Sequence, residues 1–149
     1  MRVVLQRVKW ARVIVGDEVV GEIERGLLIL LGIARGDFEE MVLPMARKVA
    51  GLRIFADDAD KMNLSLGDVG GGALVVSQFT LFADCRKGRR PYFGYSEAPE
   101  RAAQLYQAFC QGLSEVGVHR VESGRFGAMM QVELCNDGPV TIILNSEDL

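Results

Sequence analysis

Alternation of polar and apolar residues over the N-terminal stretch restricts the fold more than any other feature of the chain. Arg2–Val8 and Trp10–Val15 both follow this pattern, which is typical of strands buried on one face. Gly16-Asp17 predicts a turn into a further strand, Glu18–Ile23, so that an antiparallel meander begins the chain. Leu27–Ile33 is a continuous apolar run and predicts a central strand.

Two segments have apolar residues at helical spacing. The first, Asp37–Leu52, would be capped by its aspartate; Pro44 requires that this helix either starts just before the proline or kinks there. The second runs from Pro99 to Val116, and Gly117 ends it. Two helices among about seven strands predict an α+β fold, with a curved or barrel-like, mainly antiparallel sheet and two packed helices.

Length and composition limit the class of protein. The 149 residues show no internal repeat or linker, so residues 1–149 are predicted to form a single domain. With a net charge of −3, the protein as a whole does not attract polyanions. A polyanion such as a nucleic acid could bind only at a local cluster of positive side chains. The N-terminal stretch resembles neither a signal peptide nor a membrane span. Three dispersed cysteines without a C-x-x-C pair favour reduced thiols, and we expect a cytoplasmic protein.

The sequence lacks the usual catalytic sets. His119 is the only histidine and has no acidic partner at a suitable spacing, which argues against a Ser-His-Asp triad. Cys110, on the apolar face of the second helix, and Cys135, beside a turn, are interpreted as small hydrophobic residues. No phosphate loop, dinucleotide fingerprint, G-x-S-x-G motif or metal-ligand cluster occurs. No metal and no cofactor are predicted.

Polar residues interrupt the apolar run of a predicted strand, Ala73–Phe82. Alternate residues of a strand point to opposite faces, so Ser77 and Phe79 would share one face and Gln78 and Thr80 the other. Taken alone, these polar side chains also fit a strand that faces solvent or satisfies local hydrogen bonds.

A second unusual stretch, CNDGPVT, occupies Cys135–Thr141 between two alternating apolar stretches. Asn-Asp-Gly alone predicts a hairpin turn. Pro139 removes a backbone donor where the second strand should begin pairing, and it restricts Gly138. A simple hairpin does not need so rigid a corner, which therefore requires another explanation.

The loop Ala83–Tyr95 holds the strongest local basic run of the chain. Its cations are interleaved with Tyr92 and Phe93 and comprise Arg86, Lys87, Arg89 and Arg90. Such a run suits contact with phosphates and stacking on bases, and it equally suits a solvated loop.

These stretches together make the chain resemble the D-aminoacyl-tRNA deacylases, the type once called D-Tyr-tRNA deacylase. The resemblance covers essentially all 149 residues, and SQFTL with NDGPVT in this order is highly specific. Met129 departs from the pattern, since many relatives carry a polar residue there. The matching motifs are QRV at Gln6–Val8, GLLILLGI at Gly26–Ile33, RIF at Arg53–Phe55, KMNLS at Lys61–Ser65, VVSQFTL at Val75–Leu81, KGRRPYF at Lys87–Phe93, GRFGAMMQV at Gly124–Val132 and NDGPVT at Asn136–Thr141.

The resemblance implies a hydrolase that cleaves the ester of D-aminoacyl-tRNA, and of glycyl-tRNA, but spares L-aminoacyl-tRNA. It implies a cis peptide between Gly138 and Pro139, whose carbonyls enter the pocket of a second subunit in a homodimer and capture the amino group of the substrate. An L-side chain would strike this corner, so selectivity comes from exclusion. Arg7 is implied to clamp the corner from behind.

For the pocket, the resemblance implies oxyanion donors among the backbone N–H groups of Ser77, Gln78, Phe79 and Thr80. Phe126, Ala128 and Met130 would line the wall. Either the Thr80 hydroxyl acts as nucleophile or orients water, or the 2′-hydroxyl of the terminal tRNA adenosine assists; we favour the second. Arg86, Lys87, Arg89 and Arg90 would hold the acceptor end of the tRNA.

Two other classes of protein remain open at this stage. One is a non-catalytic RNA-binding dimer that uses the same basic loop without turnover. The other is an oligomeric interaction module in which the Gly-Pro corner only shapes the interface. In every case we expect neither DNA nor a membrane as partner.

Overall fold

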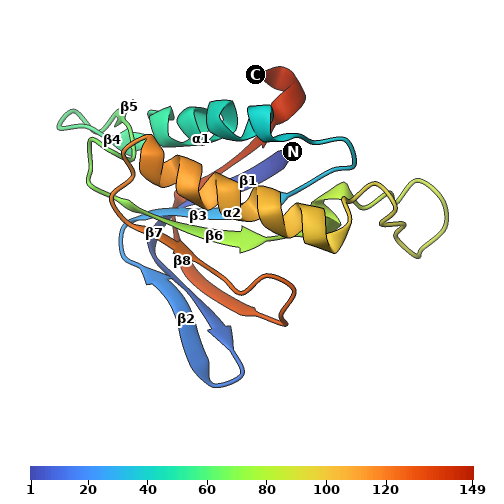
Figure 1. Ribbon diagram of the computed structural model, residues 1–149. Helices are drawn as coiled ribbons and strands as arrows, with labels where there is room; N and C mark the ends of the chain where they lie inside the picture. The colour runs from blue at the N-terminus through green and yellow to red at the C-terminus, as the bar shows by residue number, and fades with distance from the viewer.

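A computed structural model describes residues 1–149 as a curved sheet with two helices packed side by side against one face (Figure 1). None of the helices is both long enough and apolar enough to cross a membrane. In chain order the elements are β1 (Arg2–Val15), β2 (Glu18–Ile23), β3 (Gly26–Gly32), η1 (Glu39–Met41), α1 (Val42–Gly51), β4 (Phe55–Ala56), β5 (Met62–Leu64), β6 (Gly72–Ser77), η2 (Phe79–Phe82), α2 (Pro99–Glu115), β7 (Val121–Ser123), β8 (Gln131–Asn145) and η3 (Ser146–Asp148).

Six strands form the main sheet in the order β2-β1-β3-β6-β7, with β8 also paired to β1. The pairs of β1 with β2, β3 and β8 are antiparallel, whereas β3–β6 and β6–β7 are parallel. The parallel pairs arise because the connection β3–β6 contains α1 and the connection β6–β7 contains α2, as crossovers between parallel strands usually do. The predicted α+β fold with a curved sheet is confirmed, and the sheet is mixed.

The sheet nearly closes on itself where β2 approaches β7. Gly21 permits this approach, because a Cβ at that position would lie only 2.6 Å from the carbonyl oxygen of Ser123. The guanidinium of Arg120 also donates to the Glu22 carbonyl at 2.7 Å. A small apolar core lies within this curvature and consists of Val8, Ala11, Val13, Ile23, Leu28, Leu74 and Val76.

A larger core fills the space between the sheet and the helices. It takes alternate residues from β1, such as Val3 and Leu5, which is what the predicted alternation requires. From α2 it takes residues one helical turn apart, such as Leu105, Phe109 and Leu113. Each such side chain contributes about 1.5–3 kcal/mol when fully buried, so this interface holds the helices on the sheet.

The two predicted strands Arg2–Val8 and Trp10–Val15 are one continuous strand, β1. Its register with β8 shifts between Gln6 and Val8 and again between Val8 and Trp10. The Gly-Pro corner of β8 lies opposite this point. The irregular pairing accommodates the extra residues of the corner, so both strands continue past it. After α2 the chain forms one short strand, β7, and one long strand, β8.

The first helix begins later than predicted. A single 3₁₀ turn, η1, precedes α1, which starts at Val42, so Pro44 lies in the first turn, where a missing N–H is tolerated. Of the two alternatives for Pro44, the late start is therefore correct. Asp37 does not cap the helix, and its carboxylate instead accepts the Ala34 N–H at 2.7 Å.

The second helix starts where predicted and ends at Glu115, one residue before the predicted end at Val116. Pro99 is its first residue, and the chain turns away at Gly117, which has φ of +97°. The Gly117 N–H donates to Ser114 at 3.1 Å and the Val118 N–H donates to Leu113 at 3.0 Å. These two bonds form a Schellman motif, which satisfies the last carbonyl groups of the helix.

Candidate active site

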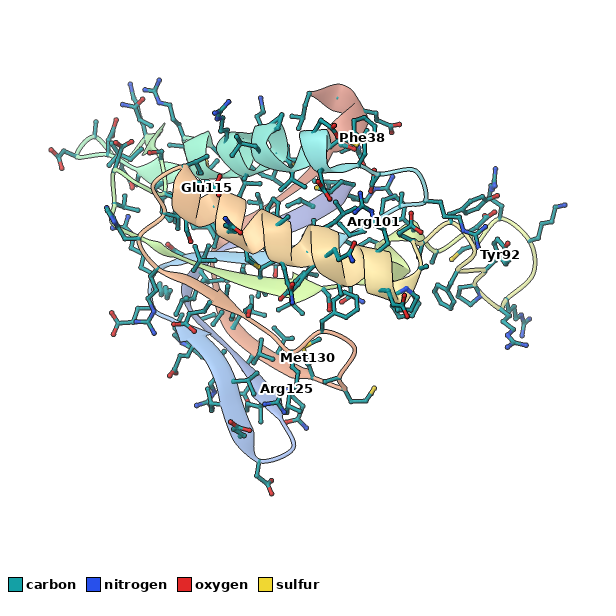
Figure 2. The ribbon with its side chains drawn as sticks, viewed as in Figure 1. Phe38, Tyr92, Arg101, Glu115, Arg125 and Met130 are labelled. Carbon is teal, nitrogen blue, oxygen red and sulfur yellow. The ribbon has the colours of Figure 1, made fainter.

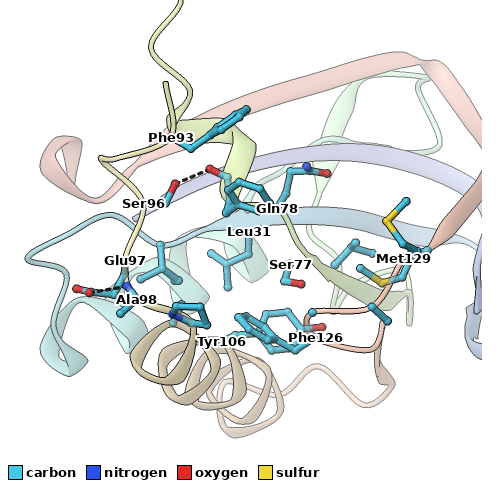
Figure 3. Close-up of a pocket in the computed structure, with 18 of the residues that line it drawn as sticks. Leu31, Ser77, Gln78, Phe93, Ser96, Glu97, Ala98, Tyr106, Phe126 and Met129 are labelled. Atoms are coloured by element: carbon cyan, nitrogen blue, oxygen red, sulfur yellow. Dashed lines mark hydrogen bonds between the residues drawn. The ribbon is translucent and has the colours of Figure 1, made fainter. Parts of the chain in front are cut away.

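A cavity of about 770 Å³ lies beside the end of β6 and the start of α2, bordered by the segment between β7 and β8 (Figure 3). Its volume is in the range of small-molecule sites, and 13 of its 20 lining residues are hydrophobic. Three stretches far apart in sequence form most of it. They are Val76–Phe79, Ser96–Pro99 and Phe126–Met130.

The predicted strand Ala73–Phe82 ends early, at the cavity. β6 stops at Ser77, and the next residues wind into the 3₁₀ turn η2. The parallel pairing with β3 ends at Leu31, whose carbonyl accepts the Gln78 N–H at 2.8 Å. The expectation that Ser77 and Phe79 share one face of a strand is therefore wrong, because a 3₁₀ turn does not alternate faces.

Three of the four predicted catalytic residues line the cavity: Ser77, Gln78 and Phe79. Thr80 is exposed and lies outside the lining, and its hydroxyl accepts the Gln78 Nε2 donor at 2.5 Å. The Gln78 N–H is already bonded, whereas the first N–H groups of a helical turn, here those of Phe79 and Thr80, have no acceptor within the turn.

The opposite wall contains the predicted residues Phe126, Ala128 and Met130. Phe126 packs at 5.7 Å, between ring centroids, against Tyr106 of α2 (Figure 3). Met129 also lines the cavity, yet this residue is 91% exposed. The rim of the cavity thus presents an apolar side chain to solvent.

Tyr106 and Ser96 are among the cavity residues that had not been singled out from the sequence. Tyr106 belongs to the predicted apolar stripe of α2, and its hydroxyl donates to the Val75 carbonyl at 2.7 Å. Burial raises the pKa of Tyr106, so the phenol stays protonated even at alkaline pH. Ser96 donates from Oγ to the Phe79 carbonyl at 2.9 Å and thereby fixes η2. In the sequence, Tyr106 is a residue with a hydroxyl group on the apolar face of a predicted helix, and this could have marked it as a site residue. Nothing in the sequence around Ser96 marked that residue.

The Gly-Pro corner lies away from the cavity of its own chain. Gly138 and Pro139 are exposed, are joined by a cis peptide and do not line the cavity. The Asn136 side-chain oxygen accepts the Val140 N–H at 3.0 Å, which closes the corner. The resemblance implies that this corner enters the pocket of a second subunit, and within one subunit it does not line the cavity.

Arg7 lies directly behind this corner. Its Nε donates to the Asp137 carbonyl at 2.9 Å, and its Nη1 donates to the Ile54 carbonyl at 2.5 Å. The Asp137 carboxylate is also within 3.5 Å of Nε. At Gly138, where φ is +143°, a Cβ would lie 2.7 Å from Val140 Cγ2 and 2.8 Å from the Val140 nitrogen, so only glycine suits the position.

The basic loop projects from the body near the start of α2, where Tyr92 is labelled in Figure 2. Arg86 forms two bonds with the Asp84 carboxylate, at 2.8 and 2.7 Å. These bonds lower the pKa of Asp84 to about 2. The other three cations, Lys87, Arg89 and Arg90, are exposed and take part in no ion pair.

Comparison with known proteins identifies the family and the fold. The sequence profile described as D-Tyr-tRNA(Tyr) deacylase matches residues 4–145. The chain belongs to this family. A D-aminoacyl-tRNA deacylase of Roseiflexus sp. is 60% identical over 98% of the chain and 94% of the relative, and one of Thermus aquaticus is 56% identical over 99% and 97%. The predicted D-aminoacyl-tRNA deacylase, a hydrolase, is thereby confirmed.

Solved structures give the same fold for this deacylase family member. A structure described as c-Myc DNA Unwinding Element Binding Protein has a TM-score of 0.91 at 40% identity, covering 97% of this chain and 98% of that one. A probable eukaryotic D-amino acid tRNA deacylase has a TM-score of 0.83 at 22% identity, covering 96% and 97%. The second likeness extends to the fold alone.

The thiols of the deacylase are not arranged for catalysis. Burial raises the pKa of Cys110 to about 11, so this thiol is protonated at neutral pH and is a poor nucleophile. Cys85 is exposed on the basic loop and Cys135 is half-buried in β8. No three His, Cys, Asp or Glu side chains gather in a metal-binding cluster.

Proposed function

We propose that this deacylase cleaves D-aminoacyl-tRNA and spares the L-ester through a site shared by two subunits. The cavity of one subunit would hold the ester, and the Gly-Pro corner of the partner would complete it. The separation of the two motifs within one chain carries the proposal: Ser77 and Phe79 line the cavity, whereas Gly138 and Pro139 are exposed elsewhere.

A symmetric homodimer would bring the two halves together. β8, which carries the corner, pairs with β1 alone, and its other edge has no strand beside it. Ile143 of this strand is 62% exposed. A long strand with a free edge and exposed apolar side chains is normally covered by a partner, and a second copy is the partner that also supplies the missing corner.

The reaction would depend on positioning and oxyanion stabilisation. An aminoacyl ester is already activated, so water attack needs mainly donors for the developing oxyanion, here the N–H groups of Phe79 and Thr80. The Thr80 hydroxyl is bonded to Gln78, and the cavity offers no histidine as base. The neighbouring 2′-hydroxyl of the terminal adenosine would therefore assist the attack, and free amino acid and tRNA would leave.

Chirality would be read by the partner's corner. The carbonyl groups of Gly138 and Pro139 would accept hydrogen bonds from the amino group of the substrate, with a D-side chain directed outward. An L-side chain would meet the corner and be excluded. Because glycine has no side chain, glycyl-tRNA would be a second substrate.

The acceptor end of the tRNA would lie along the basic loop. Lys87, Arg89 and Arg90 have free charges for phosphates, and Arg86 together with Asp84 would hold the loop in shape. Such contacts are salt-dependent and independent of sequence. The protein would act in the cytoplasm, where charged tRNA is used.

Parallel deacylation of D-Tyr-tRNA and L-Tyr-tRNA at equal enzyme concentration tests the proposal. We expect release of D-tyrosine and no release of L-tyrosine above the uncatalysed rate. Equal rates on both esters would refute the chirality mechanism. RNA binding without turnover of either ester would instead favour the non-catalytic RNA-binding dimer.

Subunit mixing tests the shared site. Ala128→Phe fills the cavity, and Arg7→Ala removes the anchor of the corner, so each variant should be weakly active alone. A mixed dimer contains one site with an intact cavity and an intact corner, and mixing should restore activity. An absence of recovery despite proven subunit exchange would contradict the model, as would an active monomer.

A further inference from the structure

Arg35 is the one cation among the 20 residues that line the cavity. It is exposed, in the turn between β3 and η1, and it belongs to none of the seven ion pairs of the chain. By contrast, Arg86 of the basic loop and Arg101 of α2 are both neutralised by carboxylates. Glu97, the one anion of the lining, accepts the Ala98 N–H at 2.7 Å and forms no ion pair with Arg35. The Arg35 guanidinium is therefore available to an anionic group of the ligand.

The backbone holds Arg35 at the cavity rim. Its N–H donates to the Tyr95 carbonyl at 3.0 Å, and the neighbouring Ala34 forms an antiparallel bridge with Ser96. The Asp37 carboxylate closes the turn by accepting the Ala34 N–H. The turn is thus attached to the segment that leads into α2 and forms part of the cavity wall.

Tyr95 also connects this turn to the basic loop. Its carbonyl accepts from the Arg35 backbone, and its hydroxyl accepts from Arg86 Nη2 at 3.4 Å. Cationic side chains therefore continue from the cavity rim at Arg35 to the loop that carries Lys87 and Arg90. A polyanion whose last unit enters the cavity would meet positive charge first at the rim and then along the loop.

We propose that Arg35 binds the 5′-phosphate of the terminal adenosine of the substrate. This inference rests on the proposed function, which places that adenosine in the cavity. The ribose that carries the ester on its 3′-oxygen also carries this phosphate, so every aminoacyl-tRNA presents an anion at a fixed distance from the scissile bond. The guanidinium attracts the phosphate and repels the substrate ammonium group, and this polarity orients the nucleoside in the cavity.

Two small esters isolate this contact. One is the 3′-D-tyrosyl ester of adenosine, and the other is the same ester of adenosine 5′-phosphate. We expect the wild-type protein to hydrolyse the phosphorylated ester with a kcat/KM at least about tenfold higher, as loss of a charge-assisted hydrogen bond implies. Arg35→Gln should abolish this preference, and Arg35→Lys should retain part of it.

Arg47→Gln is the matched control, because Arg47 is exposed on α1, belongs to no ion pair and does not line the cavity. It should keep the full preference for the phosphorylated ester. With D-Tyr-tRNA, a plot of log kcat/KM against log salt concentration has a negative slope. The slope should become less steep by about 0.7 in Arg35→Gln and stay unchanged in the control.

Two results would overturn the inference while D-Tyr-tRNA is still hydrolysed. One is a wild-type protein that does not distinguish the two esters, and the other is an Arg35→Gln variant that keeps the preference. A wild-type protein that fails to hydrolyse D-Tyr-tRNA at all would overturn the proposed function instead.

Discussion

Replacing Arg7 by alanine measures how strongly the Gly-Pro corner is held. The Arg7 side chain is only 13% exposed, and its bond to the Asp137 carbonyl, at 2.9 Å, is its direct link to the corner. A hydrogen bond from a charged donor contributes about 1.5–3 kcal/mol. Because 1.36 kcal/mol corresponds to a factor of ten, loss of this bond should lower the equilibrium constant between the held and the released corner by about 10- to 150-fold.

The assay is hydrolysis of D-Tyr-tRNA and L-Tyr-tRNA by Arg7→Ala. We expect kcat/KM for the D-ester to fall by up to this factor and the D-over-L preference to decrease, since the corner would both capture the amino group and exclude L-side chains. Arg12→Ala is the matched control. Arg12 also joins β1 to β8, through Glu133 at 2.6 Å, but it is 41% exposed, and such pairs contribute about 0–1 kcal/mol.

Full activity and unchanged selectivity in Arg7→Ala would refute the clamp, because the corner would then hold its conformation without the guanidinium. An equal loss in Arg12→Ala would refute it as well, since the effect would then come from a general weakening of the β1–β8 pairing. Thermal unfolding of both variants, measured alongside, separates loss of the folded protein from loss of the corner.

Other perturbations have equally definite outcomes. Thr80→Ala should keep deacylase activity within about tenfold if the substrate hydroxyl assists, whereas a thousandfold loss with unchanged tRNA binding would make Thr80 the nucleophile. Dialysis against EDTA should leave the rate on D-Tyr-tRNA unchanged, and a loss that zinc alone restores would contradict a metal-free reaction. Iodoacetamide at pH 8 should label the exposed Cys85 and spare Cys110 until the chain unfolds. Because folding raises the pKa of the Cys110 thiol from 9.0 to about 11, its contribution to stability is present below pH 9 and should be lost as pH rises towards 11, as urea unfolding would detect. Gly21→Ala should lower the free energy of unfolding by about 1–3 kcal/mol, because its Cβ would meet a β7 carbonyl, while Gly51→Ala, with open space around it, should not.

The amino-acid sequence by itself determined the elements whose signals are local. Alternation identified the strands of the N-terminal meander, and Pro99 with Gly117 marked the ends of the second helix. These signals involve residues close together in the chain, so they do not depend on the tertiary packing of the elements. The motifs SQFTL and NDGPVT were likewise sufficient to identify the family.

Only the tertiary structure decided where these motifs lie. The strand expected through Phe82 ends at Ser77, because its partner β3 ends and the chain turns against it. The parallel pairs depend on two crossover helices, and neither crossover can be recognised from the composition of a strand. Tyr106 and Arg35 reach the cavity only because distant elements fold around it. The separation of the Gly-Pro corner from its own cavity has the same cause: contacts between segments far apart in sequence depend on the packing of the whole chain, which local patterns do not encode.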